Sequence, residues 1–309
     1  MFNKCKMAED KHVSICVCTY RRPELLERLL AGAILQKTDG LFGYSVVIVD
    51  NDSEESARET VETYALRSKI PIDYHVEPEQ NIALARNRAV KNAKSDLIVF
   101  IDDDEIPDED WLLNLYEAFC RFQADGILGP VKPYFETQPP GWIISSKICE
   151  RRSFSTGTIL RDARYTRTGN VLLKREILVD GGDPFNPLFG KTGGEDGDFF
   201  RRRLQKGNRF IWCNEACVSE IVPPERFRRS YWVRKAFLQG SAFAKSERIS
   251  LLSIDSVKSF LAIMIYTPAL PILILIRHDL FMKFLVKVCY HLSTLLTVCG
   301  VSAAKERVF

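Results

Sequence analysis

Four consecutive acidic residues follow a short apolar run in the first half of the chain. Residues 96–101 read DLIVFI, and the next four are Asp102, Asp103, Asp104 and Glu105. A run this short and this rich in Val and Ile predicts a strand that is buried on both faces of a parallel sheet. Because such sheets bind ligands at the carboxyl ends of their strands, we expect these carboxylates to face a ligand.

The chemistry of this acidic segment, residues 102–105, predicts a metal site. Clustered carboxylates without a nearby thiolate or imidazole are hard oxygen donors, which suit Mg²⁺ or Mn²⁺ holding a diphosphate better than zinc. The alternative is that the acids only cap a helix that begins near Asp108, because acidic side chains are favoured in a first helical turn. The local sequence leaves both interpretations open.

Composition predicts an ordinary folded protein with one large domain or two small ones. Of its 309 residues, 46% are hydrophobic and 27% are charged. The 43 basic and 40 acidic residues give a formal charge of +3, so composition offers no argument for nucleic acid as a partner. The nine cysteines are scattered without paired C-x-x-C units, which predicts neither a zinc site nor a disulfide framework. Residues 1–14 contain no apolar stretch long enough for a signal peptide, so we expect the catalytic part in the cytoplasm.

Short apolar runs alternate with helical patterns through residue 125, which indicates a βαβ architecture. We predict strands at residues 13–18, 45–49 and 72–76. Pro23 marks the start of one helix, and residues 81–94 form another that brings Arg86 toward the acidic segment. Farther along, the alternation gives way to the short strands and turns of a mixed sheet, which suits an acceptor-binding half.

A second acidic feature is Glu195 with Asp196, which we call the acidic pair. Two glycines precede it and a basic helix follows, in the sequence GGEDGDFFRRRLQKG. The glycines free the backbone, so the pair is expected to face a cleft from a helix N-terminus, although helix capping alone also explains it. Acids therefore recur at three strand or helix ends that one cleft could collect, namely Asp50, residues 102–104 and Asp196.

Several motifs follow one another in a specific order over residues 12–248. They read VSICVCTYRRPELLERLL, VVIVDNDS, NIALARNRA, IVFIDDDEIP, TGNVLLKREIL, GGEDGDFFRRR and VPPERFRRSYWVRKAFLQG. In this order they resemble an inverting family 2 glycosyltransferase with a GT-A fold, and look closest to the succinoglycan-type exopolysaccharide glucosyltransferases. The resemblance implies an α/β fold in which a Rossmann-like nucleotide-binding half is fused to a mixed-sheet acceptor half.

The resemblance also implies residues that bind the nucleotide-sugar. Thr19 and Tyr20 would border the nucleotide, Asp50 would hold the base, and Arg86 would support the base or a phosphate. All four belong to the half that precedes the acidic segment or to the helix that leads into it.

Metal binding and catalysis are assigned to the two acidic features. Asp104 is implied as the direct metal ligand and Asp102 as a ribose contact and second metal ligand, while Asp103 is a further candidate for either role. Asp196 would be the general base and Glu195 an acceptor contact. A divalent cation, Mg²⁺ or Mn²⁺, would stabilise the departing diphosphate.

The implied reaction transfers a hexose from a nucleotide-sugar, such as a UDP-sugar, to a hydroxyl of a lipid-linked or saccharide acceptor in cell-surface polysaccharide synthesis. Two departures from the family pattern bear on it. Many relatives carry a His in the segment that reads CVSEIVP at residues 217–223. The absence of this His bears on which residues complete the set of metal ligands. The Q-x-x-R-W signature of processive synthases is absent, which favours addition of a single sugar.

Two functions from other classes are the alternatives. A metal-dependent nucleotidyltransferase also uses paired aspartates on an α/β sheet, but should show a glycine-rich basic loop where this chain reads VCTYRRPELL. A non-catalytic membrane-associated scaffold would need the acids only as helix caps. The missing glycine-rich loop argues against the nucleotidyltransferase, and the recurrence of acids at three element ends argues against the scaffold.

The C-terminal part predicts association with a membrane. Residues 257–276 approach the roughly 20 residues that span a bilayer. Residues 280–304 are apolar but interrupted by Lys283, Lys287 and His291, which suits an interfacial or re-entrant helix. Residues 227–248 predict a basic and aromatic helix for anionic headgroups. We expect the protein at the cytoplasmic face of the inner or plasma membrane, the alternative being a helical hairpin packed on the catalytic domain.

These observations divide the chain into five expected segments. They are an N-terminal tail at residues 1–11, the nucleotide-sugar-binding half at 12–125, the acceptor-binding half with the catalytic base at 126–224, a basic amphipathic helix at 225–249, and membrane-associated helices at 250–309.

Overall fold

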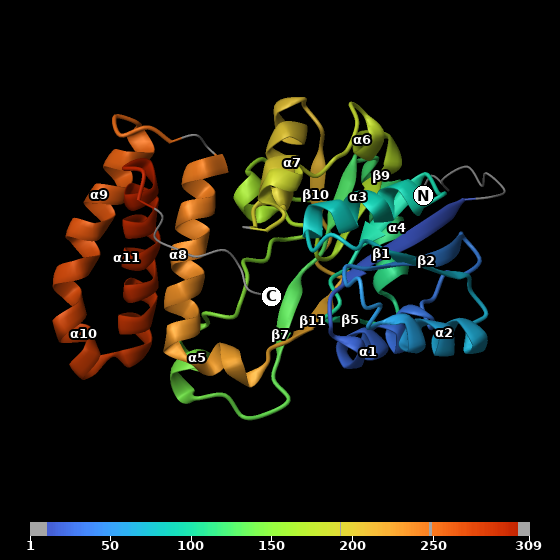
Figure 1. The fold of residues 1–309 in the computed structure, drawn as a ribbon, viewed down its shortest axis with the longest axis horizontal. Coiled ribbons are helices and arrows are strands. Elements are labelled where there is room, and N and C mark those ends of the chain that lie inside the picture. The colour runs from blue at the N-terminus through green and yellow to red at the C-terminus, as the bar shows by residue number, and fades with distance from the viewer. Residues whose placement is uncertain (1–10, 192, 247–248, 302–309) are drawn as a thin grey trace. The chain divides into compact units, whose positions relative to one another are not determined.

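The computed structural model of the chain describes residues 11–191, 193–246 and 249–301 (Figure 1). Nearly all of the expected N-terminal tail therefore lies outside the described residues. The chain divides into two compact units, which we call the first and the second unit. The first comprises Met1–Lys132, Arg151–Gly190 and Glu195–Ile221, and the second comprises Pro133–Glu150, Lys191–Gly194 and Val222–Phe309.

An eight-stranded mixed sheet forms the centre of the first unit, with the strand order β3-β2-β1-β4-β9-β6-β10-β8. The strands are β1 (His12–Thr19), β2 (Gly43–Asp50), β3 (Ile72–Val76), β4 (Leu97–Phe100), β6 (Gly126–Leu128), β8 (Ile159–Leu160), β9 (Val171–Lys174) and β10 (Phe210–Trp212). β1 pairs in parallel with β2 and β4, whereas β9 runs antiparallel to β4 and β6. The parallel first half and mixed second half confirm the expected α/β class.

Helices cover both faces of this sheet. They are α1 (Pro23–Ala33), α2 (Arg58–Arg67), α3 (Ile82–Asn92), α4 (Trp111–Phe122), α6 (Arg175–Val179) and α7 (Glu195–Gln205), with the short η1 (Ala163–Tyr165) and η2 (Pro187–Phe189). Successive residues of β1 point to opposite faces. Ile15 packs in the cluster that contains Leu30 of α1, while Cys16 packs in the cluster that contains Ala89 of α3. The strand is therefore buried on both sides, as its unbroken apolar sequence predicts.

The acidic segment leads into a second, three-stranded sheet with the order β5-β11-β7. Its strands are β5 (Glu105–Pro107), β11 (Val218–Ile221) and β7 (Val131–Tyr134). Glu105 pairs with Glu220 across the antiparallel β5 and β11. Helix α4 begins only at Trp111, after the N-cap residue Asp110, which makes no side-chain capping hydrogen bond. The acidic segment therefore runs into a strand, β5, that begins at Glu105, and the helix-cap interpretation of it is wrong.

The second unit is helical. It contains α5 (Gly141–Ser146), η3 (Pro224–Phe227), α8 (Arg229–Ser246), α9 (Ile254–Tyr266), η4 (Thr267–Ala269), α10 (Leu270–Ile276) and α11 (His278–Val298). Figure 1 shows α11 between α8 and α9. A Cβ built on Gly240 of α8 would lie 2.2 Å from the carbonyl oxygen of Tyr290 on α11, so only glycine permits this close approach.

Two stretches of the second unit are long and apolar enough to cross a membrane, judged by length and composition. The first is Ile254–Ile276, in which only 6% of an apolar stretch of 18 residues is buried. The second is His278–Val298, in which 22% of such a stretch is buried. Core helices of a soluble domain bury most of such a surface. The apolar side chains of α9 and α10 are therefore largely without protein cover among the described residues.

Candidate active site

Arg86 lies on helix α3 of the first unit. The helix begins after Asn81, whose side-chain oxygen accepts a hydrogen bond from the N–H of Ala83 at 3.0 Å. Arg86 is only 8% exposed, and its guanidinium donates hydrogen bonds to Glu195 and, at 3.4 Å, to Asp102. Burial alone would lower the pKa of Arg86, but the carboxylates of Glu195 and Asp102 raise it further than burial lowers it. One buried cation thus joins the acidic segment to the acidic pair.

Asp103 connects the acidic segment to the end of β1. The hydroxyl of Thr19 donates to Asp103 at 2.9 Å, and Arg22 donates to its other carboxylate oxygen at 3.2 Å. Burial raises the pKa of Asp103, while Arg22 and Thr19 act in the opposite direction. Tyr20 follows Thr19, and the guanidinium of Arg21 lies 5.2 Å from the centre of its ring. Both oxygens of Asp103 are therefore engaged by the chain itself.

Asp102 and Asp104 are the remaining candidates for holding a metal ion. The side chain of Asp102 is 41% exposed and that of Asp104 is 12% exposed. Among the described residues, no group of three or more His, Cys, Asp or Glu side chains is arranged to hold a metal ion. Two hard carboxylates nevertheless suit Mg²⁺ or Mn²⁺, because such ions are commonly held by one or two carboxylates together with phosphate oxygens of the substrate. The residues fit a cation that binds with its nucleotide.

Glu105 closes the acidic segment with a fully buried carboxylate. One of its oxygens accepts a hydrogen bond from the backbone N–H of Asp102 at 3.2 Å. Arg151 lies 4.0 Å from its other oxygen and donates to Glu220 at 2.5 Å. Burial, with Asp102 adding to it, raises the pKa of Glu105 well above its ordinary value. The sequence assigned no role to Arg151 or Glu220, because their pairing joins segments 69 residues apart that no local pattern connects.

Asp50, which the resemblance assigns to the base, is fully buried at the end of β2. Its carboxylate accepts hydrogen bonds from the N–H of Ala57 at 2.8 Å, the N–H of Asp52 at 3.1 Å and the hydroxyl of Tyr74 at 2.9 Å. Burial raises its pKa despite these bonds. Asp50 therefore fixes the loop after β2 through hydrogen bonds to the backbone of that loop. Its role in nucleotide binding stays a prediction.

The acidic pair starts α7. Gly193 and Gly194 precede it with φ angles of 83° and 103°, a region that L side chains rarely adopt. Glu195 is 5% exposed and held by Arg86, whereas Asp196 is partly exposed and accepts a hydrogen bond from the N–H of Gly197 at 2.7 Å. Of the two carboxylates, Asp196 is thus the one open to a further ligand.

Arg86 contacts both Asp102 and Glu195, which joins two of the three acidic element ends directly. Asp50 ends β2 opposite Thr19 of β1, whose hydroxyl donates to Asp103, so the third element end adjoins the acidic segment. The carboxylate of Asp50 itself contacts the loop after β2 and β3.

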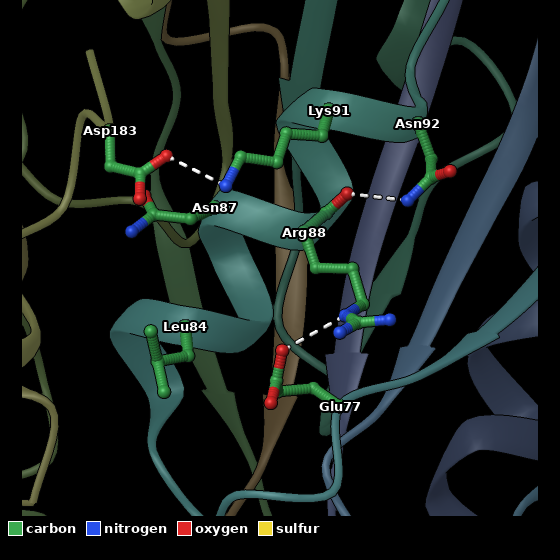
Figure 2. A pocket seen from close by; sticks show the side chains of 7 residues that line it. All are labelled: Glu77, Leu84, Asn87, Arg88, Lys91, Asn92 and Asp183. Carbon is green, nitrogen blue, oxygen red and sulfur yellow. Dashed lines mark hydrogen bonds and ion pairs between the residues drawn. The ribbon is translucent and has the colours of Figure 1, made fainter.

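A separate pocket of about 290 Å³ lies beside α3. It is lined by Glu77, Leu84, Asn87, Arg88, Lys91, Asn92 and Asp183. Figure 2 shows that its charged groups already face one another, with Arg88 donating to Glu77 at 2.9 Å and Lys91 lying 3.0 Å from Asp183. None of the residues predicted for the reaction lines this pocket, so it is distinct from the candidate active site.

The central mixed sheet has the architecture of the GT-A glycosyltransferases. The chain belongs to glycosyl transferase family 2, whose family model matches residues 14–180. It is 35% identical over 240 residues to the succinoglycan biosynthesis protein ExoM of Rhizobium meliloti (strain 1021), covering 77% of this chain and 75% of that protein. It is 26% identical over 251 residues to the hyaluronan synthase of Pasteurella multocida, covering 70% of this chain but 25% of that protein.

Solved structures share the fold. The mannosyltransferase PcManGT from Pyrobaculum calidifontis, in complex with GDP-Man and Mn²⁺, aligns with a TM-score of 0.62 at 19% identity over 95% of this chain and 88% of that one. TarS 1-349 of S. aureus, in complex with UDP, aligns with a TM-score of 0.55 at 16% identity over 94% of this chain and 92% of that one. The expected GT-A fold is therefore confirmed.

Proposed function

We propose that the protein is an inverting, metal-dependent glycosyltransferase that moves a hexose from a UDP-sugar to a hydroxyl of a saccharide or lipid-linked acceptor in cell-surface polysaccharide synthesis. The observation that carries this proposal is the contact of Arg86 with both Asp102 and Glu195. It brings a candidate metal carboxylate close to the residue next to the candidate base. Two relatives named for succinoglycan biosynthesis and hyaluronan synthesis support the polysaccharide product.

Donor binding is assigned to the strand ends of the first unit. Asp102 and Asp104 would hold Mg²⁺ or Mn²⁺, Thr19 and Tyr20 would border the nucleotide, and Asp50 would act on the base through the loop it organises. The cation, when bound, neutralises charge on the departing diphosphate. UDP in one similar structure and Mn²⁺ in another support this choice of donor and ion.

Asp196 is the general base in this mechanism. Its partly exposed carboxylate takes the proton of the acceptor hydroxyl as the oxygen attacks the anomeric carbon from the face opposite the diphosphate, which inverts the configuration. A carboxylate suffices as this base, because the hydroxyl becomes acidic as its bond to carbon forms. Glu195, fixed by Arg86, contacts the acceptor.

The apolar helices suggest where the reaction occurs. In α9 and α10, Ile265 is 67% exposed, Leu275 is 84% exposed and Ile276 is 68% exposed. Arg228 before α8, Arg229 at its start and Arg234 within it are also exposed, which suits anionic headgroups. We therefore assign the enzyme to a membrane surface, on its cytoplasmic side, where lipid-linked acceptors and nucleotide-sugars meet.

Membership in glycosyl transferase family 2 favours this function over a nucleotidyltransferase or a scaffold. The test is incubation of the full chain in detergent with Mn²⁺ and a panel of UDP- and GDP-sugars, with release of free nucleoside diphosphate as the readout. We expect release from one donor, stimulated by a saccharide acceptor and abolished by chelation. Nuclear magnetic resonance of the product then gives the anomeric configuration. No release from any donor overturns the proposal, and a retained configuration overturns its inverting part.

A further inference from the structure

Arg167 lies in the loop between η1 and β9 and is partly buried. Its side chain forms no hydrogen bond or ion pair with any residue that the structure describes. The other arginines near the acids are each matched with a carboxylate. These pairs are Arg22 with Asp103, Arg86 with Glu195, and Arg151 with Glu220.

Arg167 lies within electrostatic range of both acidic features. Glu105, Asp196 and Glu220 are close enough to act on its charge, as is Arg151. Two residues farther along, a Cβ built on Gly169 would lie 2.8 Å from carboxylate oxygens of Asp102 and of Glu105. The loop of Arg167 therefore packs directly against the acidic segment.

The charge of Arg167 lacks a direct partner in a place where water is partly excluded. Burial, with Arg151 adding to it, lowers the pKa of Arg167 to about 10, so the group remains protonated at neutral pH. A cation held away from water without a partner is unfavourable, and an anionic ligand would remove that cost. The planar guanidinium matches two oxygens of a phosphate.

We propose that Arg167 binds the diphosphate of the donor and stabilises the negative charge that develops on the departing nucleoside diphosphate. The proposal rests on the proposed transferase function. The diphosphate is preferred over an anionic acceptor because Glu105, which acts on the charge of Arg167, directly follows Asp104, a residue that would hold the cation. Arg167 and the residues that would hold the cation are therefore both assigned to the diphosphate.

The test compares the wild type with Arg167→Gln and Arg167→Lys in a displacement assay with a fluorescent nucleotide and Mn²⁺. UDP and uridine are the competitors. For Arg167→Gln we expect UDP affinity to fall roughly 10-fold or more, as expected for loss of a charge-assisted hydrogen bond. Competition by uridine, which has no phosphate, should stay within about twofold of the wild type, and Arg167→Lys should recover part of the loss.

Arg88→Gln is the matched control, because Arg88 is paired with Glu77 in the separate pocket and its side chain is 42% exposed. It should leave UDP affinity unchanged. The inference is overturned by unchanged UDP affinity in Arg167→Gln, by equal losses for UDP and uridine, or by a defect confined to the acceptor KM. If the wild type itself binds neither UDP nor GDP, the result contradicts the proposed transferase function and not only the role of Arg167.

Discussion

Arg86 on α3 donates a hydrogen bond to Glu195 at the start of α7, 109 residues farther along the chain. Both side chains are nearly inaccessible, at 9% and 7% exposure. Removing one partner of such a buried pair leaves an uncompensated charge and typically costs about 3–5 kcal/mol. Since Arg86 also contacts Asp102, the position of the acidic pair depends on the acidic segment.

Replacing Asp104 by Asn should weaken metal-dependent donor binding. If Asp102 and Asp104 hold the cation with the diphosphate, loss of one of two carboxylates removes a large part of the protein's share of the ligands. Calorimetry with UDP should show an affinity that rises with Mn²⁺ in the wild type and hardly responds to it in the variant. Asp108→Asn is the control, because Asp108 is exposed and lies outside the acidic segment. An unchanged response to Mn²⁺ in Asp104→Asn would refute the assignment.

Asp196→Asn should separate binding from chemistry. The loss of a general base acts in the transition state, so turnover should fall about 10²-fold or more while the Kd for UDP stays within about twofold. Steady-state kinetics and calorimetry measure the two effects. Asp198→Asn, on the same helix, loses ion pairs with Arg201 and Arg202 and should reduce thermal stability while keeping turnover. A parallel loss of UDP binding in Asp196→Asn would indicate a structural role instead.

Local sequence patterns predicted the elements that lead to the site. The strand expected at residues 72–76 is β3 with the same bounds, and the helix expected to start at Pro23 is α1. A buried parallel strand has an unbroken apolar sequence, and proline is favoured in the first turn of a helix. Both signals lie within a few consecutive residues, so the sequence alone predicts these elements. The family, and with it the GT-A fold, followed from the order of the motifs.

The remaining features of the site depend on contacts between segments that lie far apart in the sequence. No local sequence pattern reveals such contacts. Asn170 is fully buried with a left-handed φ of 59°. Its side-chain oxygen accepts from the indole N–H of Trp111 at 2.7 Å, and its amide donates to the carbonyl oxygens of Pro130 and Ala216. These partners lie far from it in the sequence. The unpaired state of Arg167 is equally invisible from its neighbours in the chain.

Stability should depend on pH through Asp125. Partial burial alone would raise its pKa, but hydrogen bonds from the N–H of Arg209 and from Asn208 and Lys174 hold the pKa below its ordinary value. The stabilisation is therefore present above the ordinary pKa of about 4 and is lost as the pH falls through the lower folded-state value. Asp125→Asn should be about 1–2 kcal/mol less stable than the wild type at pH 7, because hydrogen bonds to a charged group are lost.

Chemical denaturation at pH 7 and in steps below pH 4 measures this effect. The difference between wild type and Asp125→Asn should shrink as the pH falls. Asp73→Asn is the control, because Asp73 is exposed on β3. A difference that stays constant from pH 7 to pH 2 would show that the carboxylate charge of Asp125 does not contribute.

Exposed apolar side chains of the second unit should determine binding to membranes. Ile265 is 67% exposed and Leu275 is 84% exposed, so replacing both by Glu removes few protein contacts. If these helices enter a bilayer, each buried charge is unfavourable, and the double variant should move from vesicles to the soluble fraction in a flotation assay. Its thermal midpoint in detergent should stay close to that of the wild type.

Leu66→Glu on α2 provides a control at a similar exposure of 89% that lies outside these helices, and it should float with vesicles as the wild type does. Substitution tests the membrane surface more cleanly than truncation after Ile249, because α8 packs closely on α11 at Gly240 and a shortened chain would expose that contact. In the double variant, activity on a vesicle-bound acceptor should fall more than activity on a short soluble one, since the surface no longer concentrates the enzyme beside its substrate. A wild type that stays soluble without detergent and never floats would contradict membrane association and leave the apolar helices as the covered core of a larger assembly.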